Sequence, residues 1–372
     1  MKVLYIGHYK EGTGWSNAAI NYILALDSIG VDVVCRNIKL TNNQVAIPHR
    51  ILELEHKTIK NVDYCIQHVL PHHLVGTKKF KKNIAYFVNE SYPIKNIMWF
   101  ETLKLMDEIW VPNQTNKDDI LNCDNTLKVR VIPHTFDLER YNYTYEKLNF
   151  HSYNSKFKFY TIADINDRKN LNTILRCFFS EFSNDEPVCL VLKLKKYGLS
   201  SAELINIVKK ESDYIKKNMR LFNDINSYAQ EIIITEDMDN NKIYQLHSSC
   251  DCFINPSHGE GWSIPSFEAM CFGKTPICSK EGGPALFIPN DNKNCGTLVD
   301  GIYGICDHSD PAFPELFSGN QHWFIPSDLE IKKAMRYYFE NKDNIDRKDG
   351  LKIAESYSFT NIGNLIKDSL ND

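Results

Sequence analysis

The apolar and polar positions of this chain alternate between short apolar runs and longer segments with helical spacing. The short runs are rich in β-branched and aromatic residues, which is typical of buried strands. They lie at residues 2–7, 63–68, 83–88, 108–112, 157–163, 187–194, 231–235, 251–255 and 275–278. Helical segments follow most of them, for example at residues 239–250 and 263–272. This alternation predicts an α/β protein with parallel sheets and helices between the strands.

The length of the chain predicts two domains, because 372 residues exceed what one hydrophobic core usually supports. Residues 141–156 are polar and aromatic and are interpreted as a linker. We therefore predict one domain at residues 1–150 and a second at residues 151–356. Residues 301–326 contain Pro311, Pro314 and Pro326 and are predicted to form loops.

The most informative stretch is residues 250–279, which predicts a strand, a loop, a helix and a second strand in succession. Gly259 and Gly261 in the loop would let the backbone approach a ligand closely. Ser263 is a candidate N-cap for the helix, and a proline such as Pro265 is tolerated in a first helical turn. The start of such a helix favours an anion, most often phosphate.

Two carboxylates flank this predicted helix start. Glu260 lies in the loop and Glu268 lies within the helix, so a rise of about 1.5 Å per residue separates them by roughly the length of a nucleotide diphosphate. A carboxylate accepts two hydroxyl hydrogen bonds at once, which suits the vicinal diols of sugars. The pair therefore predicts binding of a sugar on one side of the phosphates and of a ribose on the other.

The Glu-x7-Glu arrangement of Glu260 and Glu268, within GEGWSIPSFEAMCFGKTPI, resembles the donor site of family-four glycosyltransferases of the GT-B fold. The resemblance implies two Rossmann-like domains facing each other across a cleft, with the last helix, at about residues 357–372, packing back on the first domain. It implies that Glu260 contacts the donor sugar and Glu268 contacts the ribose. Gly259, Gly261, Trp262 and Ser263 would line the same donor site.

Other segments of the second domain also resemble this family. Arg168 and Lys169 match its Arg-Lys segment, whose lysine neutralises the donor diphosphate. The family often has a further arginine where this chain has Asp164, so either Arg168 substitutes for it or backbone amides do. Gly282 and Gly283 form a strand-exit loop that lines the donor site in the family; they either offer amides to phosphate or make a plain turn.

Two sites in the first domain are candidates for the same cleft. Gly12, Thr13 and Gly14 form a glycine loop that contacts the donor phosphates or the acceptor in the family, or else is only a tight turn into the first helix. Glu90 follows a predicted strand, where open α/β sheets place ligand-binding loops. It either faces the reacting sugar as a catalytic residue or caps the next helical segment.

Composition and charge bear on the possible partners and location of the protein. A net charge of −4 disfavours nucleic acid as a partner, because such proteins present a strongly basic face. The basic run Lys78, Lys79, Lys81 and Lys82 is either a patch for a membrane surface or anionic acceptor, or a solvated face. The start of the chain lacks an apolar signal-peptide core and no run of 18 apolar residues occurs, so a cytoplasmic location is expected, with peripheral contact to the inner membrane surface left open.

Metal and dinucleotide chemistry are not predicted. The 11 cysteines include no Cys-x-x-Cys pair and are interpreted as reduced, mostly buried thiols. His68, His72 and His73 have no acid at ligand spacing, and Pro71 interrupts any helix that would align them. Asn17 stands where a dinucleotide fingerprint needs its third glycine. The Tyr143 and Lys147 pair, which resembles that of short-chain reductases, therefore lacks its cofactor site.

These observations predict a retaining glycosyltransferase that moves a hexosyl or pentosyl group from a UDP- or GDP-sugar to a glycan, a glycolipid or another hydroxyl acceptor, without a metal or other cofactor. A nucleotide-sugar epimerase or oxidoreductase is an alternative, but it requires the missing fingerprint. A catalytically silent sugar-binding protein of the same fold is a second alternative, but it would be expected to lack the two acids.

Overall fold

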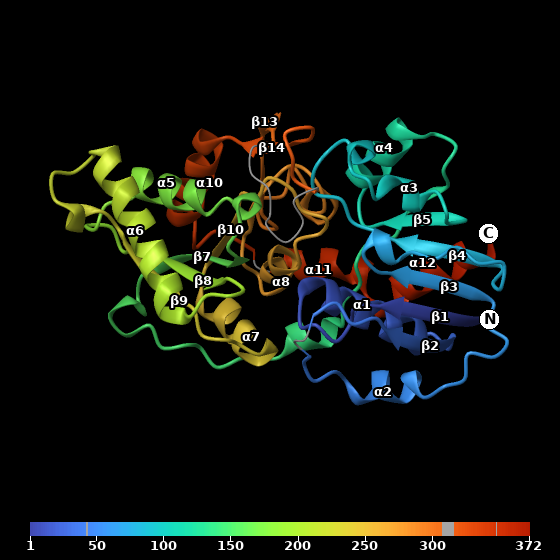
Figure 1. Ribbon diagram of the computed structural model, residues 1–372. Helices are drawn as coiled ribbons and strands as arrows, with labels where there is room; N and C mark the ends of the chain where they lie inside the picture. The colour runs from blue at the N-terminus through green and yellow to red at the C-terminus, as the bar shows by residue number, and fades with distance from the viewer. Residues whose placement is uncertain (42–43, 307–315, 347) are drawn as a thin grey trace. The chain divides into compact units, whose positions relative to one another are not determined.

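The computed structural model describes residues 1–41, 44–306, 316–346 and 348–372. The chain divides into two compact units. Unit 1 contains residues 1–140 together with residues 316–322 and 353–372, and unit 2 contains residues 141–306 and 323–352, within the described ranges. Each unit has its own parallel sheet (Figure 1).

Unit 1 is built on a six-stranded sheet with the order β2-β1-β3-β4-β5-β6, and every neighbouring pair is parallel. Its strands are β1 Lys2–Gly7, β2 Asp32–Asn37, β3 Tyr64–His68, β4 Lys82–Tyr86, β5 Glu108–Val111 and β6 Val129–Val131. Its helices are α1 Gly14–Ser28, α2 His49–Glu55, α3 Phe100–Leu103, α4 Gln114–Cys123 and α12 Phe359–Asn371. The central strands are buried on both faces, as expected for a parallel sheet covered by helices.

The last helix of the chain, α12, packs on α1 within unit 1 (Figure 1). Ile362, Ile366 and Leu370 recur at helical spacing and are buried in the same core as the apolar face of α1. Gly363 permits the close approach, because a Cβ at this position would lie 2.8 Å from the carbonyl oxygen of Ala25. The end of the chain therefore completes the core of its first unit.

Unit 2 repeats the architecture, with the strand order β12-β11-β10-β7-β8-β9 and parallel pairing throughout. Its strands are β7 Phe157–Asp164, β8 Val188–Lys195, β9 Gln230–Ile234, β10 Cys252–Asn255, β11 Ile277–Ser279 and β12 Thr297–Val299. Its main helices are α5 Leu171–Glu181, α6 Ser201–Met219, α7 Asn240–Ser249, α8 Ile264–Cys271, α9 Pro284–Phe287 and α10 Asp328–Glu340, and α11 Asp349–Ala354 follows them. The predicted pair of Rossmann-like α/β units is confirmed.

The prediction that residues 301–326 form only loops is wrong. Strands β13 Gly301–Ile305 and β14 His322–Pro326 form a two-stranded sheet. The close pairing depends on a glycine, because a Cβ on Gly301 would lie 2.1 Å from the carbonyl oxygen of Ile325. Proline is tolerated at a strand end, which is where Pro326 lies. Pro311 and Pro314 lie outside the described residues.

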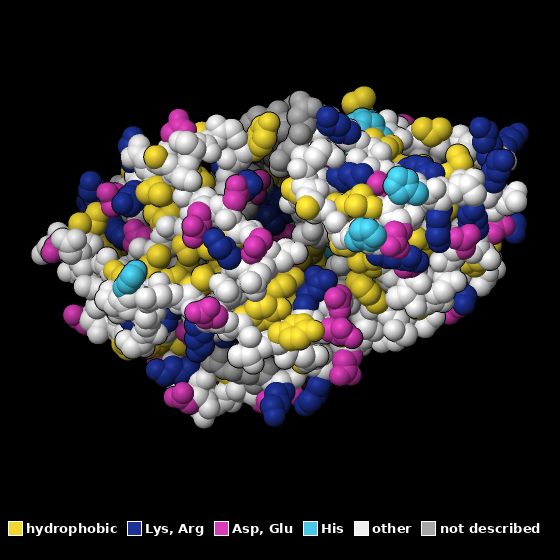
Figure 2. Space-filling model, turned by 90° about the horizontal axis from the view of Figure 1, so that it is seen from below, with side chains coloured by type: hydrophobic (Ala, Val, Ile, Leu, Met, Phe, Trp, Pro, Cys, Tyr) yellow, Lys and Arg dark blue, Asp and Glu magenta, His cyan; other side chains and the backbone are white. Residues whose placement is uncertain are grey.

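The cysteines are reduced and mostly buried, as predicted, and the surface charges are mixed in sign. All eleven cysteines are free thiols, and all but Cys123 are buried. On the face shown in Figure 2, Lys and Arg side chains are interspersed with Asp and Glu side chains. No helix among the described residues is both long enough and apolar enough to cross a membrane.

Candidate functional site

The candidate site lies at the carboxyl edge of the sheet in unit 2. Strands β7 and β10 are parallel neighbours, so the loops that follow them emerge side by side. The first loop carries Arg168 and Lys169 in a 3-10 turn, Asp167–Lys169. The second loop carries Gly259, Glu260 and Gly261 and leads into α8. The topology thus brings together charged residues that are distant in the sequence.

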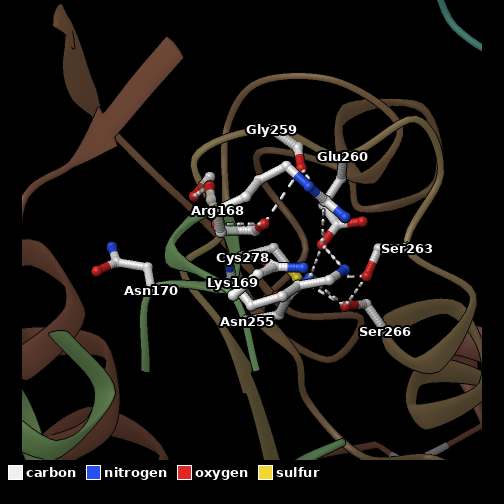
Figure 3. A network of polar contacts seen from close by, with 12 residues as sticks. Arg168, Lys169, Asn170, Asn255, Gly259, Glu260, Ser263, Ser266 and Cys278 are labelled. Atoms are coloured by element: carbon white, nitrogen blue, oxygen red, sulfur yellow. Dashed lines mark hydrogen bonds and ion pairs between the residues drawn. The ribbon is translucent and has the colours of Figure 1, made fainter. Parts of the chain in front are cut away.

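Glu260 is the centre of the network that joins these loops (Figure 3). Its Oε1 accepts a hydrogen bond from Nζ of Lys169 at 2.5 Å and another from Nδ2 of Asn255 at 3.2 Å. The Nη1 of Arg168 lies 3.6 Å from the same oxygen. Oε2 accepts no hydrogen bond from any residue that the structure describes. One carboxylate oxygen is therefore fixed by the protein and the other can accept a hydrogen bond from a ligand.

The site carries more positive than negative charge. The Glu260 side chain is 6% exposed, whereas Lys169 and Arg168 are 19% and 14% exposed. Burial opposes ionisation of Glu260, but the charges of Lys169 and Arg168 and the hydrogen bonds from Lys169 and Asn255 outweigh it and hold the pKa of this carboxyl below its ordinary value. Two cations beside one carboxylate leave an excess that suits an anionic ligand.

Backbone hydrogen bonds hold the two loops against each other. The Nη1 of Arg168 donates to the carbonyl oxygen of Gly259 at 2.6 Å. The carbonyl oxygen of Arg168 accepts from the amide of His258 at 2.8 Å and from the hydroxyl of Ser257 at 2.9 Å. Arg168 therefore has a structural function in placing the Gly259–Gly261 turn, in addition to its charge near Glu260.

Ser263 occupies the N-cap position of α8, but its hydroxyl makes no cap hydrogen bond. It adopts the left-handed conformation, with φ 70°, and its Oγ contacts Asn255 Nδ2 at 2.8 Å and Ser266 Oγ at 2.6 Å. The amides of Ser266 and Phe267 both donate to the carbonyl oxygen of Ser263, and Pro265 has no amide hydrogen. The amides of Ser266 and Phe267 are therefore already bonded within the protein at this helix start.

Gly282 and Gly283 lie directly behind Glu260. The amide of Gly283 donates to the carbonyl oxygen of Glu260 at 2.9 Å. A Cβ on Gly282 would lie 2.1 Å from that oxygen, and a Cβ on Gly283 would lie 2.2 Å from Cα of Trp262. In this structure the two glycines allow a close packing of backbone against backbone, which fixes the loop that carries Glu260.

The indole of Trp262 is buried and points into the core of unit 2. Its ring centroid lies 5.4 Å from that of Phe287 and 5.9 Å from that of Phe267. These contacts anchor the segment between Glu260 and α8. The side chain of Trp262 therefore packs behind the loop that carries Glu260.

Glu268 lies on α8 and has different partners from Glu260. Its Oε1 accepts a hydrogen bond from the hydroxyl of Tyr141 at 3.5 Å, and its Oε2 lies 3.7 Å from Nε2 of His247. The other ring nitrogen of His247 contacts the hydroxyl of Tyr160 at 2.7 Å. Burial lowers the pKa of His247, although Glu268 acts in the opposite direction. The sequence analysis did not find Tyr141 or His247, because neither belongs to the motif.

The candidates in unit 1 lie at the carboxyl edge of its own sheet. Thr13 is the N-cap of α1, and its side chain accepts a hydrogen bond from the amide of Ser16. Gly12 has φ +69°, and a Cβ there would lie 2.7 Å from Cγ1 of Val45. Gly14 is the first residue of α1. The glycine loop after β1 is thus a tight entry into the helix.

Glu90 is half-buried in the loop after β4. The residues on either side of it are fixed: the Nδ2 of Asn89 donates to Oδ2 of Asp119 at 3.0 Å, and Ser91 Oγ accepts from Nε2 of Gln321 at 2.7 Å. Burial raises the pKa of Asp119 to about 6. The sequence analysis missed this polar network, because Asn89, Asp119 and Gln321 are distant in the chain and match no motif.

The histidines of unit 1 do not form a metal site. His68 is buried at the end of β3, where its Nδ1 lies 2.8 Å from the hydroxyl of Tyr5. Across the described ranges, no group of three or more His, Cys, Asp or Glu side chains has an arrangement that could hold a metal ion. In the basic run, Lys81 pairs with Asp63 and Lys82 with Glu108.

Comparison with known proteins supports the predicted resemblance of unit 2 to glycosyltransferases. Residues 215–301 match the sequence model of a family described as "Glycosyl transferases group 1". This segment contains Glu260, Glu268, Gly282 and Gly283. No curated protein matches the chain as a whole or in part.

Solved structures with the same fold cover the whole chain. HepE of Anabaena, crystallised in complex with UDP and glucose, is 12% identical, with 100% of each chain covered and a TM-score of 0.62. Sucrose-phosphate synthase of Thermosynechococcus elongatus is also 12% identical, with 100% of this chain and 98% of that chain covered and a TM-score of 0.65. The galactosyltransferase WaaB of the lipopolysaccharide outer core, in its apo form, is 11% identical, with 100% and 99% covered and a TM-score of 0.64. These likenesses confirm the GT-B fold that the sequence predicted.

Proposed function

We propose that this protein is a glycosyltransferase that takes a sugar from a nucleotide-diphosphate sugar. The observation that carries the proposal is that the two carboxylate oxygens of Glu260 have different surroundings. Its Oε1 is held by Lys169 and Asn255, whereas its Oε2 accepts no hydrogen bond from the described part of the chain. A sugar hydroxyl can donate to Oε2 while the neighbouring cations contact a phosphate.

Unit 2 is the proposed donor-binding unit. A nucleotide diphosphate would lie against Arg168 and Lys169, with its sugar at Glu260 and its ribose at Glu268. Glu268 lies on α8, eight positions further along the chain and in the second turn of the helix. The match of residues 215–301 to the glycosyl transferases group 1 family supports this placement.

UDP is the proposed nucleotide, with GDP as the alternative. HepE was crystallised with UDP and with UDP-glucose. The acceptor is proposed to be a hydroxyl group of a glycan or glycolipid, as in the galactosyltransferase WaaB, which acts on a lipopolysaccharide core.

The proposed mechanism places Lys169 and Arg168 at the leaving group. As the bond between the sugar carbon and the diphosphate oxygen breaks, negative charge grows on the diphosphate, and the two cations stabilise it. The acceptor oxygen forms the new bond on the same face of the sugar, and its proton passes to the departing diphosphate oxygen. This sequence retains the anomeric configuration and needs neither a protein nucleophile nor a metal ion.

A thermal-unfolding panel tests the proposed function. UDP, GDP, ADP, their sugar conjugates and NAD are each added to the full chain. A nucleotide sugar at 100 times its Kd should stabilise the protein by about 2.7 kcal/mol. Stabilisation by NAD alone would instead indicate an oxidoreductase. The donor that binds is then incubated with candidate acceptors, and the anomeric proton of the product is examined by NMR to establish whether configuration is retained.

A further inference from the structure

Unit 2 contains a cavity at the opposite edge of its sheet from Glu260. The cavity has a volume of about 450 Å³. Its lining includes Lys147, Lys156, Lys158, Ser249, Asp251 and Lys342. These residues come from the segment before β7 and the start of that strand, from the end of α7 and the turn that follows it, and from the segment after α10. We call this cavity the lysine pocket.

The lysine pocket is remote from the Glu260 site. Lys158 is the second residue of β7, whereas Arg168 and Lys169 follow the end of that strand. Asp251 immediately precedes β10, and Glu260 lies beyond its end. The eight residues of β7, at about 3.3 Å each, place roughly 25 Å between the two edges. A ligand in the pocket would therefore not occupy the proposed donor site.

The charge of the pocket is opposite in sign to that of the whole protein. Four lysines and one aspartate line it, a formal excess of three positive charges, whereas the chain has a net charge of −4. Across the described residues, none of the four lysines forms an ion pair. The Asp251 carboxylate instead accepts a hydrogen bond from the backbone amide of Lys158 at 2.8 Å.

Lys158 distinguishes this pocket from an ordinary basic surface. It is only 4% exposed, and its Nζ donates to the carbonyl oxygens of Asn154 at 2.9 Å and Lys156 at 2.8 Å. Its Nζ also lies 5.8 Å from the centroid of the Phe150 ring. Lys158 forms no ion pair with any described residue, so an anion in the pocket would add a favourable charge interaction to this buried cation.

The wall around Lys158 is ordered by its own hydrogen bonds. The side-chain oxygen of Asn154 accepts from the amide of Phe150 at 2.7 Å, and its side-chain nitrogen donates to Asn149 at 2.8 Å. The hydroxyl of Ser249 accepts from the amide of Leu148 at 2.7 Å. The pocket is thus formed before any ligand enters, which limits the entropy lost on binding.

We propose that the lysine pocket is a second ligand site, for a small molecule or headgroup that bears a phosphate or diphosphate group. Lysine ammonium groups bind phosphate as point charges, and the excess of three positive charges matches the charge of such a group. A volume of about 450 Å³ lies within the range of small-molecule sites. The proposal is independent of the nucleotide-sugar site in unit 2.

Calorimetry with inorganic pyrophosphate tests the proposal. The titration is done at low salt, with the full chain and with the double variant Lys147→Gln/Lys342→Gln, which changes two exposed residues and leaves the buried wall intact. The titrations are repeated in a Lys169→Ala background, because pyrophosphate could also bind at the donor site. In that background binding should persist while the pocket is intact and should fall at least tenfold in the pocket variant. Lys158→Met, which removes the buried ammonium, should weaken binding by at least the same factor.

The matched control is Lys210→Gln/Lys217→Gln on α6, which removes the same charge from exposed lysines outside the pocket. It should bind pyrophosphate like the wild type. Sedimentation with phosphatidylglycerol vesicles distinguishes a lipid headgroup from a free phosphate compound, since vesicle binding that only the pocket variant loses would identify the headgroup. Equal pyrophosphate affinity in the pocket variant and the α6 control would overturn the proposal. The proposal would also be overturned if neither pyrophosphate nor the vesicles bound to the wild-type protein.

Discussion

The Nζ of Lys169 lies 2.5 Å from Oε1 of Glu260, although 91 positions separate the two residues in the chain. The contact arises because β7 and β10 are parallel neighbours and both loops leave the same edge of the sheet. It orients the lysine and leaves the second carboxylate oxygen for a ligand. The proposed transfer chemistry depends on this pair.

Replacing Lys169 by alanine should lower kcat by a factor on the order of 10² to 10³, because the lysine acts on charge that grows as the diphosphate leaves. Steady-state kinetics with the donor identified by thermal unfolding provide the measurement. Lys210→Ala, on the exposed face of α6, is the control and should retain wild-type kcat. An unchanged kcat in Lys169→Ala would remove this lysine from the mechanism.

Two glycines with almost the same positive φ separate local backbone strain from displacement of Glu260. Gly282 has φ +81° and Gly198 has φ +82°, but only at Gly282 would a Cβ meet other atoms, at 2.1 Å from the carbonyl oxygen of Glu260. Gly198→Ala should cost about 1 to 2 kcal/mol of stability, from the left-handed conformation alone.

Gly282→Ala should cost more, and it should also lower kcat by about 10²-fold, because it displaces the loop that carries Glu260. Chemical denaturation and kinetics on both variants provide the comparison. Equal effects of the two substitutions on both quantities would show that the close packing behind Glu260 has no influence on the site.

The sequence predicted the regular elements well where hydrophobic periodicity is strong. The strand predicted at 251–255 is β10 Cys252–Asn255, and the helix predicted at 263–272 is α8 Ile264–Cys271. The two-stranded sheet of β13 and β14 was missed because its strands are short and partly exposed, so they lack a continuous apolar run. Such a small sheet is determined by tertiary contacts that no local pattern encodes.

The candidate site was only partly predictable. The motif located Glu260 and Glu268, but their immediate partners could not be read from it. Asn255, which binds Glu260 and Ser263, looks like an ordinary strand end in the sequence. His247 looks like a residue on the polar face of a helix, yet it is fully buried beside Glu268. Long-range contacts of this kind depend on strand order, which sequence periodicity does not specify.

Asp119 predicts a pH dependence of stability. Burial raises its folded-state pKa to about 6, above the unfolded value of about 3.9, so the folded protein disfavours the ionised carboxylate. The unfolding free energy should therefore fall as pH rises through this interval. Asp119→Asn keeps an oxygen for Asn89 and Ile94 but cannot ionise.

The stability of Asp119→Asn relative to wild type should increase by roughly 1 kcal/mol between pH 5 and pH 7. Urea denaturation of both proteins at the two pH values gives the difference, in which the contributions of other titrating groups cancel. A difference that does not change with pH would mean that Asp119 titrates normally.

Turnover is expected to survive EDTA, because the proposed mechanism assigns the leaving-group charge to Lys169 and Arg168 instead of a divalent ion. The rate is measured with and without the chelator and after addition of Mg²⁺ or Mn²⁺. A complete loss of activity in EDTA that metal restores would contradict the metal-free mechanism.

The most direct test of the proposed donor site is calorimetry of the free nucleoside diphosphate with wild type, Glu260→Ala and Glu268→Ala. Glu268→Ala removes an acceptor from the ribose, so binding should weaken by about 1.5 to 3 kcal/mol. Glu260→Ala removes a negative charge beside Lys169, so the free nucleotide, which lacks the sugar, should bind at least as well as to wild type. The reverse order of affinities would contradict the proposed placement of the sugar at Glu260 and the ribose at Glu268.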